Sequence, residues 1–203
     1  MGNREDLLAG ARKVILERGV AKATARDIAS AAGVSLAAIG YHFGSKEELI
    51  TAALMESLGD GIGDGMERIV GETAELPLRE GFAELWNRMP EVFAANREAL
   101  LASMDNTVRV LRDPGAALAL ADAAGEGYLG MAEQLRAARP DLDEDDVVAV
   151  ARLQFVLVQS LGILWLMDPG MLPSGDELAR AVAVIAGDGG SGVSGSASGA
   201  ANG

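Results

Sequence analysis

The sequence predicts an all-α protein with a small N-terminal head, joined by a long helix to a larger helical body. Apolar residues recur at spacings of three and four through almost every segment, while the alternating pattern of a strand is nearly absent. Prolines also stand at or just before several expected helix starts, where a missing N–H is tolerated. These prolines are Pro77, Pro114, Pro140 and Pro173.

Two helices are expected to open the chain. Residues 4–18 place their apolar side chains on one side, and Gly19 follows as a C-terminal stop. Thr24 offers a hydroxyl N-cap for a short helix over residues 25–32, which Gly33 ends. These start and stop signals predict two helices separated by a short connection.

A third short helix and the start of a fourth follow. Ser35 is expected to cap a helix over residues 36–42, and Ser45 with Glu48 forms an S-x-x-E capping box that starts the next helix. The apolar side chains of the three short helices are spaced to face one another. They are Leu8, Ala11, Ile15, Ile28, Ala29, Val34, Ile39 and Phe43.

The fourth helix carries an apolar stripe through a glycine-rich stretch, residues 59–65. The stripe consists of Ile50, Leu54, Leu58, Ile62, Met66 and Ile69. The stretch lacks the Lys-Ser/Thr of a phosphate loop and the final Glu of a calcium loop. We therefore interpret it as a weakened helix, since each interior glycine costs about 1 kcal/mol relative to alanine, and as a compliant joint between head and body.

The remaining chain predicts further helices over residues 78–95, 97–112, 114–138, 143–168 and 174–187. Pro90 falls inside the first of them and should kink it. The acidic run 141–146 is compatible with a metal cluster, but negative charge at the N-terminus of a helix explains it better. Residues 188–203, mostly Gly, Ser and Ala, are expected to be a disordered tail.

Composition excludes several kinds of chemistry. The chain has no cysteine and a single histidine, His42, so disulfides, thiolate nucleophiles and His- or Cys-rich metal sites are excluded. No paired catalytic constellation stands out, and we expect no enzyme, no cofactor and no metal. No unbroken apolar run approaches 18 residues and the first residues lack an apolar signal core, so we expect a cytoplasmic protein with no membrane partner.

Charge is divided unevenly along the chain. The net charge is −13, yet residues 1–50 carry seven basic and six acidic side chains, while residues 51–203 carry ten and 24. An acidic body repels phosphate and leaves the near-neutral head to approach a nucleic acid. The helix pair joined by the glycine turn 31–35 is typical of a helix-turn-helix, whose second helix fits the major groove of DNA.

The residues of the head resemble a known family. The pattern Thr24-x-Arg26-x-Ile28-Ala29-x-x-Ala32-Gly33-Val34-Ser35, followed by Ile39-x-Tyr41-His42-Phe43-x-Ser45-Lys46-Glu47-x-Leu49, resembles the DNA-binding head of the tetracycline-repressor (TetR) family. The resemblance covers residues 4–55. It implies a transcriptional regulator, a repressor that forms a homodimer, reads a palindromic operator and is released when a small effector binds the body.

The resemblance also implies roles for individual residues. Phosphate contacts are implied for Thr24, Ser35, Tyr41, His42 and Lys46, and hydroxyls, an amine and a helix N-terminus suit phosphate. Arg26 is implied as a base reader, because arginine can bind guanine O6 and N7. Leu36 and Ala37 complete the predicted DNA-binding set. With Ala38 and Gly40, the latter where many members carry a tyrosine, they give the recognition helix little hydrogen-bonding reach, so we expect modest sequence specificity.

The body is expected to hold a dimer interface and an effector pocket. Residues 147–167 are apolar nearly all round and need cover, from a second subunit or from the chain's own core. The predicted interface comprises Val150, Leu157, Val158, Leu161, Trp165 and Val182. The predicted pocket for a largely apolar effector comprises Trp86, Met89, Phe93, Met104, Asp105, Arg109, Tyr128, Met131, Phe155 and Gln159, with Asn106 as a further polar candidate.

These inferences divide the chain into a helix-turn-helix DNA-binding domain over residues 1–48, an effector-binding and dimerisation domain over residues 49–187, and the tail. The alternative is a helical small-molecule-binding or scaffold protein that does not use its head for DNA. Binding to the protein's own upstream DNA, weakened by salt and by Lys46→Ala, would distinguish the two.

Overall fold

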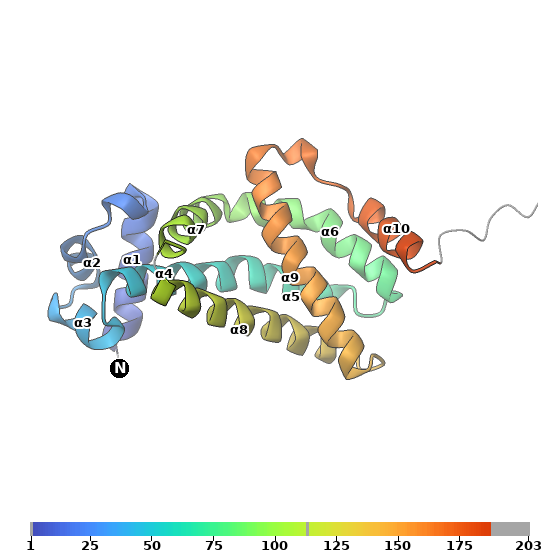
Figure 1. The fold of residues 1–203 in the computed structure, drawn as a ribbon, viewed down its shortest axis with the longest axis horizontal. Helices are drawn as coiled ribbons and strands as arrows, with labels where there is room; N and C mark the ends of the chain where they lie inside the picture. The colour runs from blue at the N-terminus through green and yellow to red at the C-terminus, as the bar shows by residue number, and fades with distance from the viewer. Residues whose placement is uncertain (1, 113, 188–203) are drawn as a thin grey trace, which may run out of the picture.

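The computed structural model describes residues 2–112 and 114–187, so the predicted tail lies outside the described residues. Every described element is helical, which confirms the predicted all-α class. The head lies at one end of the molecule (Figure 1). Its elements are α1 (Gly2–Arg18), the 3₁₀ turn η1 (Val20–Lys22), α2 (Ala25–Ala32) and α3 (Ala37–Phe43).

The body extends away from the head as a bundle in which α9 crosses α5 and α6, and α10 lies beside α6 (Figure 1). Its elements are α4 (Lys46–Leu58), η2 (Gly59–Gly63), α5 (Asp64–Glu72), α6 (Leu78–Ala95), α7 (Arg97–Val110), α8 (Pro114–Ala138), α9 (Glu144–Met167), η3 (Pro169–Met171) and α10 (Gly175–Ile185). The predicted order of helices is therefore the observed one.

A continuous apolar core holds the head together. Leu7, Ile28 and Leu49 are fully buried in it, and the inward-facing residues predicted from α1 and α2 contribute to the same cluster. The first half of α4 also belongs to this core, through Ile50 and Leu54. The head and the connecting helix are thus one packed unit, because the same apolar cluster includes residues of both.

The predicted helix caps are partly observed. Thr24 Oγ1 accepts a hydrogen bond from Asp27 N at 3.2 Å, and Ser45 Oγ accepts one from Glu48 N at 3.1 Å, as the sequence predicts. The prediction for Ser35 is wrong. Helix α3 begins at Ala37, one residue late, and its N-cap residue Leu36 has no side-chain cap. The carbonyl of Ser35, not its hydroxyl, accepts the Ala38 N–H, so the turn satisfies its own backbone.

The glycine-rich stretch forms a π-helical turn, η2, between α4 and α5. The helical path therefore continues through the glycines, but with one turn of wider π geometry in place of a regular α-helix. Two of the glycines lie close to side chains near the end of α6. A Cβ atom on Gly61 would lie 2.0 Å from Asn96 Oδ1, and one on Gly65 would lie 2.8 Å from Val92 Cγ1, whereas nothing lies within 4 Å at Gly63.

A second core joins α5, α6 and α9. Trp86, Met89 and Phe93 of α6 are buried in it with Val158 and Leu161 of α9. Helix α6 continues through Pro90. The acidic run caps α9, as predicted: Asp143 accepts a hydrogen bond from Asp146 N at 2.9 Å, and Glu144 pairs with Arg136 at 2.6 Å.

Helix α10 docks on α6 with very little space between the two backbones. A Cβ atom on Gly175 would lie 1.8 Å from the carbonyl oxygen of Ala83. The Gly175 N–H donates to Asn87 Oδ1 at 2.7 Å, and Asn87 Nδ2 donates to Asp176 Oδ2 at 3.1 Å. The Ser174 and Glu177 capping box then starts α10, so the last helix is held at its first turn.

One helix of the described chain, α9, is long and apolar enough to cross a membrane by length and composition alone. The sequence analysis did not expect a candidate span. Helix α9 packs against α8 and α6, and core helices of soluble proteins share this composition. Only 33% of its most apolar window is buried within the single chain, so much of this helix is uncovered.

Candidate nucleic-acid interface

The outer surface of the head is formed by α2, α3 and the turn between them. Gly33 adopts a left-handed conformation with φ of 69°, which reverses the chain, and the N–H of Val34 then donates to the carbonyl of Ala29 at 3.0 Å. Ile28 and Ile39 face the core from the two helices. The turn therefore leaves the opposite side of α3 exposed, which is the geometry that a major groove accepts.

The predicted DNA-binding residues fall mainly on this exposed side. Tyr41 is 85% exposed and meets the ring of His42 edge-on at 4.9 Å between centroids. The other residues of the set are exposed or half-buried. Thr24, Arg26, Ser35, Leu36 and Ala37 are exposed, and His42 and Lys46 are half-buried. Ala38, in contrast, is buried against the head.

Two members of the predicted set already have partners within the protein. The Thr24 hydroxyl donates to Asp27 Oδ2 at 2.6 Å while it caps α2. This hydrogen bond and the nearby Arg18 guanidinium, 3.0 Å away, hold the pKa of Asp27 below its ordinary value. Arg26 is exposed and makes no ion pair with the residues that the structure describes.

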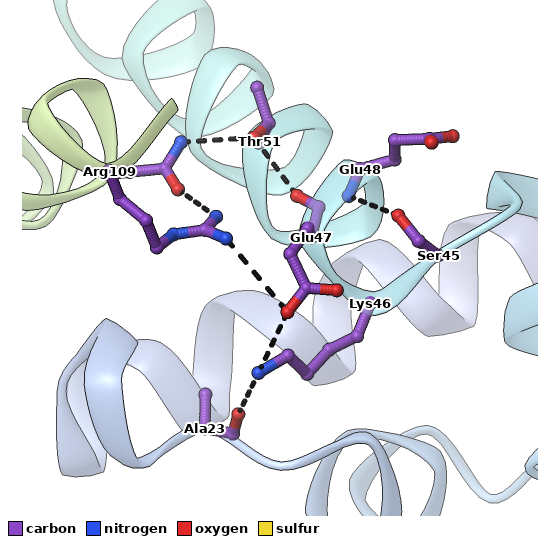
Figure 2. Close-up of polar contacts among 8 residues, drawn as sticks. Ala23, Ser45, Lys46, Glu47, Glu48, Thr51 and Arg109 are labelled. Carbon is purple, nitrogen blue, oxygen red and sulfur yellow. Dashed lines mark hydrogen bonds and ion pairs between the residues drawn. The ribbon is translucent and has the colours of Figure 1, made fainter. Parts of the chain in front are cut away.

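Lys46 is the second engaged residue (Figure 2). Its ammonium donates to the carbonyl oxygen of Ala23 at 3.3 Å and lies 3.2 Å from Glu47 Oε1. Partial burial raises the pKa of Glu47, but its own backbone hydrogen bond, Lys46 and Arg109 together hold that pKa below its ordinary value. Lys46 is thus held between the carbonyl oxygen of Ala23, which follows η1, and the carboxylate of Glu47 in α4.

The head also contacts the body through α7. Asn106 Nδ2 donates to Thr51 Oγ1 at 3.1 Å, and Arg109 Nη2 donates to Asn106 Oδ1 (Figure 2). The sequence analysis placed Asn106 and Arg109 among the polar candidates of an effector pocket. The structure instead places both at the junction between head and body, because the end of α7 packs on α4, α1 and η1.

The body contains an apolar cavity of about 320 Å³. Helix α10 and the ends of α8 and α9 that line it lie far from the head (Figure 1). Gln154 lines it and is only 5% exposed. The wall comes from α5, α6, α8, α9 and α10 and from the segment after α5. It consists of Val70, Thr73, Ala74, Leu78, Arg79, Gly81, Phe82, Leu85, Leu135, Ala138, Arg139, Val150, Leu153, Gln154, Ala179, Val182, Ala183 and Ala186.

None of the ten residues predicted for the effector pocket lines this cavity. Trp86, Met89 and Phe93 fill the second core, and Met131 packs beside it. Met104, Asp105 and Gln159 are exposed, Arg109 belongs to the junction, Tyr128 stacks under Arg152, and Phe155 lies against Gly127. The one signal for the cavity was the small residues on α10, Ala179, Ala183 and Ala186, at helical spacing.

The residues predicted for the dimer interface also lie in different environments. Val158 and Leu161 are buried within the chain, and Leu157 and Trp165 are half-buried against the same core. Val150 and Val182 line the cavity, with Val182 exposed. The uncovered face of α9 carries a different set of apolar side chains, namely Leu153, Val156, Ile163 and Met167.

The fold and the exposed second helix of the turn define a helix-turn-helix protein. Residues 7–53 match the sequence profile of the family described as "Bacterial regulatory proteins, tetR family". By this match, the head of the chain is a DNA-binding domain of the TetR family of transcriptional regulators. The family is not one of enzymes, in agreement with the expectation from composition.

Individual relatives agree with this assignment. The repressor AcnR of Corynebacterium glutamicum is 34% identical over 82 residues, which cover 40% of this chain and 41% of AcnR. The regulator TtgR of Pseudomonas putida is 44% identical over 55 residues, 27% of this chain and 26% of TtgR. The chain therefore covers less than half the length of these curated relatives.

Solved structures extend the likeness to the whole fold. The multidrug binding protein EbrR, complexed with imidazole, has a TM-score of 0.58 and 23% identity, covering 90% of this chain and 88% of EbrR. A putative TetR-family regulator from Mesorhizobium loti has a TM-score of 0.60 and 17% identity, covering 90% and 96%. At these identities the likeness concerns the fold alone.

Proposed function

We propose that the chain is a cytoplasmic repressor that binds a palindromic operator as a homodimer and is released by a small, largely apolar effector. The observation that carries the proposal is the exposed face of α3 beside Arg26 and Tyr41 on a fully packed head. A packed head that presents a cation on α2 and a phenol on α3 suits base and phosphate contacts in a major groove.

The division of charge supports the same reading. The body repels the phosphate backbone, so the head is the part of the molecule that approaches DNA. Thr24, Ser35, Tyr41, His42 and Lys46 are proposed to contact phosphates, and Arg26 to read a base, with Leu36 and Ala37 against thymine methyl groups. The small side chains of α3 still predict modest sequence specificity.

A duplex-binding measurement tests the DNA-binding proposal. Fluorescence anisotropy with the gene's own upstream DNA should give binding that weakens steeply with salt and weakens further in Tyr41→Ala and Lys46→Ala. Arg180→Ala is the matched control, because it removes an exposed cation from α10, at the far end of the body. Equal affinity for all three variants and the wild type would contradict the proposal.

The homodimer is proposed to form through the uncovered faces of α9 and α10. Val156 is 61% exposed and Ile185 is 87% exposed, and both belong to helices whose other sides pack on the body. Apolar faces that a single chain leaves exposed favour an isologous contact with a second copy. These faces replace Val158 and Leu161, which the chain already covers itself.

Sedimentation velocity tests the proposed interface. Val156→Asp should shift the wild-type dimer to monomer, because a carboxylate would be buried without a partner. Leu129→Asp on α8, where Leu129 is comparably exposed, is the control and should remain dimeric. A wild-type monomer, or a dimer indifferent to Val156→Asp, would rule the interface out.

The effector is proposed to occupy the cavity between α6, α8, α9 and α10. Its wall is mostly apolar, and the buried Gln154 amide supplies a donor and an acceptor that orient one polar group. EbrR, which shares the fold, is described as a multidrug binding protein complexed with imidazole. The alternative of a small-molecule-binding protein without DNA contact shares this cavity.

The fluorescent probe anilinonaphthalene sulfonate tests the cavity directly. Ala183→Phe, which fills the cavity, should abolish probe binding, and Gln154→Leu should weaken it. Ala94→Phe on the exposed side of α6 is the control. Probe binding that depends on the cavity, combined with no affinity for any duplex, would favour the alternative function over the repressor.

A further inference from the structure

The polar junction between head and body has two layers. In the first layer, Asn106 of α7 is 3% exposed and uses both ends of its amide: it donates to Thr51 Oγ1 and accepts from Arg109 Nη2. The Thr51 hydroxyl in turn donates to the carbonyl oxygen of Glu47 at 3.0 Å. A buried amide with satisfied partners on two helices fixes how α7 sits on the first turns of α4.

The second layer is a carboxylate between two cations. Glu47 Oε1 lies 3.2 Å from Lys46 Nζ and 4.0 Å from Arg109 Nη1, and Figure 2 shows both cations meeting this one oxygen from opposite helices. Lys46 begins α4, whose first turns pack into the head, whereas Arg109 lies near the end of α7. The same carboxylate therefore serves one group on each side of the junction.

Sharing the carboxylate changes what Lys46 can offer to a ligand. Lys46 has one neutral partner, the carbonyl oxygen of Ala23, and one anionic partner, Glu47. A phosphate approaching Lys46 must compete with Glu47 for the ammonium. Arg109 weakens that competitor, because it draws the same carboxylate toward α7 and offsets part of its charge.

We propose that Arg109 is a positioning residue for DNA binding: it holds Glu47 toward the body and so leaves the Lys46 ammonium available to a phosphate. The proposal rests on the proposed function, in which Lys46 contacts DNA. It links the place of α7 to the charge that the head presents, because Arg109 reaches Glu47 only while Asn106 keeps α7 on α4.

A double-mutant cycle separates this mechanism from a general loss of positive charge. The affinity for the upstream duplex is measured for the wild type, Glu47→Gln, Arg109→Gln and the double variant, over a range of salt concentrations. Glu47→Gln should tighten binding and Arg109→Gln should weaken it, each by about three- to tenfold. In the Glu47→Gln background, Arg109→Gln should have no more effect than the control Arg112→Gln, which removes a cation at the exposed end of α7.

A second set of affinity measurements uses Lys46→Gln. This variant should lower the slope of log affinity against log salt by about one, and it should cancel the gain from Glu47→Gln. Arg109→Lys, which keeps the charge, should restore part of the affinity that Arg109→Gln loses. Circular dichroism melts of all variants check that the head stays folded.

The outcomes distinguish the two proposals. If the wild type binds no duplex, or if Lys46→Gln leaves the salt slope unchanged, the role of Lys46 in DNA binding fails and this inference fails with it. If Lys46 matters but Arg109→Gln weakens binding equally with Glu47 and with Gln at position 47, Arg109 acts only as a distant charge and the positioning role is overturned.

Discussion

The head and the body of this protein differ in how completely one chain covers their apolar residues. The head buries its core side chains almost entirely and leaves few large apolar residues exposed, namely Leu16, Leu36 and Tyr41. The body exposes many more large apolar residues. They include Leu101, Met104, Val108, Leu111, Leu129, Leu153, Val156, Ile163, Met167, Val182, Val184 and Ile185. The head is therefore complete in one chain, whereas the body has faces suited to a partner.

The largest expected effect comes from disrupting the core of the head, which one chain completes by itself. Leu49 is fully buried where α4 joins the head core, so Leu49→Ala should lower the free energy of unfolding by about 2–5 kcal/mol through lost burial and a cavity. Leu36→Ala, on the exposed face of the same head, should change it by less than about 0.5 kcal/mol. Urea unfolding followed by circular dichroism measures both, and similar values would show that the head is not tightly packed.

Within the body, substitutions at the contact between α10 and α6 should lower the stability most. Gly175→Ala places a Cβ atom against the backbone oxygen of Ala83, which cannot move without displacing α6, so we expect a loss of about 1–3 kcal/mol. Gly130→Ala in α8 meets nothing within 4 Å and should instead stabilise the helix by about 0.5–1 kcal/mol. Thermal melts of the two variants should therefore shift in opposite directions. A shift in the same direction would contradict the close packing of α10 on α6.

The joint between the two regions should respond more weakly. Gly61→Ala meets the flexible end of the Asn96 side chain, which can rotate away at the loss of its hydrogen bond to the Val92 carbonyl, about 1 kcal/mol. Gly63→Ala has open space and should be neutral or stabilising. If the π turn is a compliant joint, both variants should also alter release from DNA, and unchanged release curves would refute that hypothesis.

The smallest expected effect concerns how the stability of the protein depends on pH in the acid range. Backbone and side-chain hydrogen bonds from Ser174 hold the pKa of Glu177 below its ordinary value. The ionised Glu177 therefore stabilises α10 above the pKa of the unfolded chain, and this contribution is lost as pH falls through the lower, folded value. Ser174→Ala should cost about 1 kcal/mol at neutral pH and flatten the acid limb of stability against pH. Parallel curves for variant and wild type would exclude the link.

Capping and turn residues in the sequence were sufficient to predict the helices of the head. Thr24, Gly33 and Ser45 act within a few residues of themselves, so the sequence predicted the helices, their order and the turn between α2 and α3. The same residues carry the TetR resemblance. The Ser35 prediction failed even here, since Leu36 is the N-cap residue of α3 and the carbonyl of Ser35, not its hydroxyl, accepts the Ala38 N–H.

Only the tertiary structure decided which side of each body helix faces inward and which helices pack against one another. Periodicity shows that α9 is apolar all round, but not that Val158 faces inward and Val156 outward. Likewise, composition made Arg109 a candidate for an effector pocket, whereas the packing of α7 on α4 places it beside Glu47 and Lys46. The physical reason is range: caps and turns depend on neighbours in sequence, while cavities, interfaces and the polar junction depend on contacts between helices far apart in the chain.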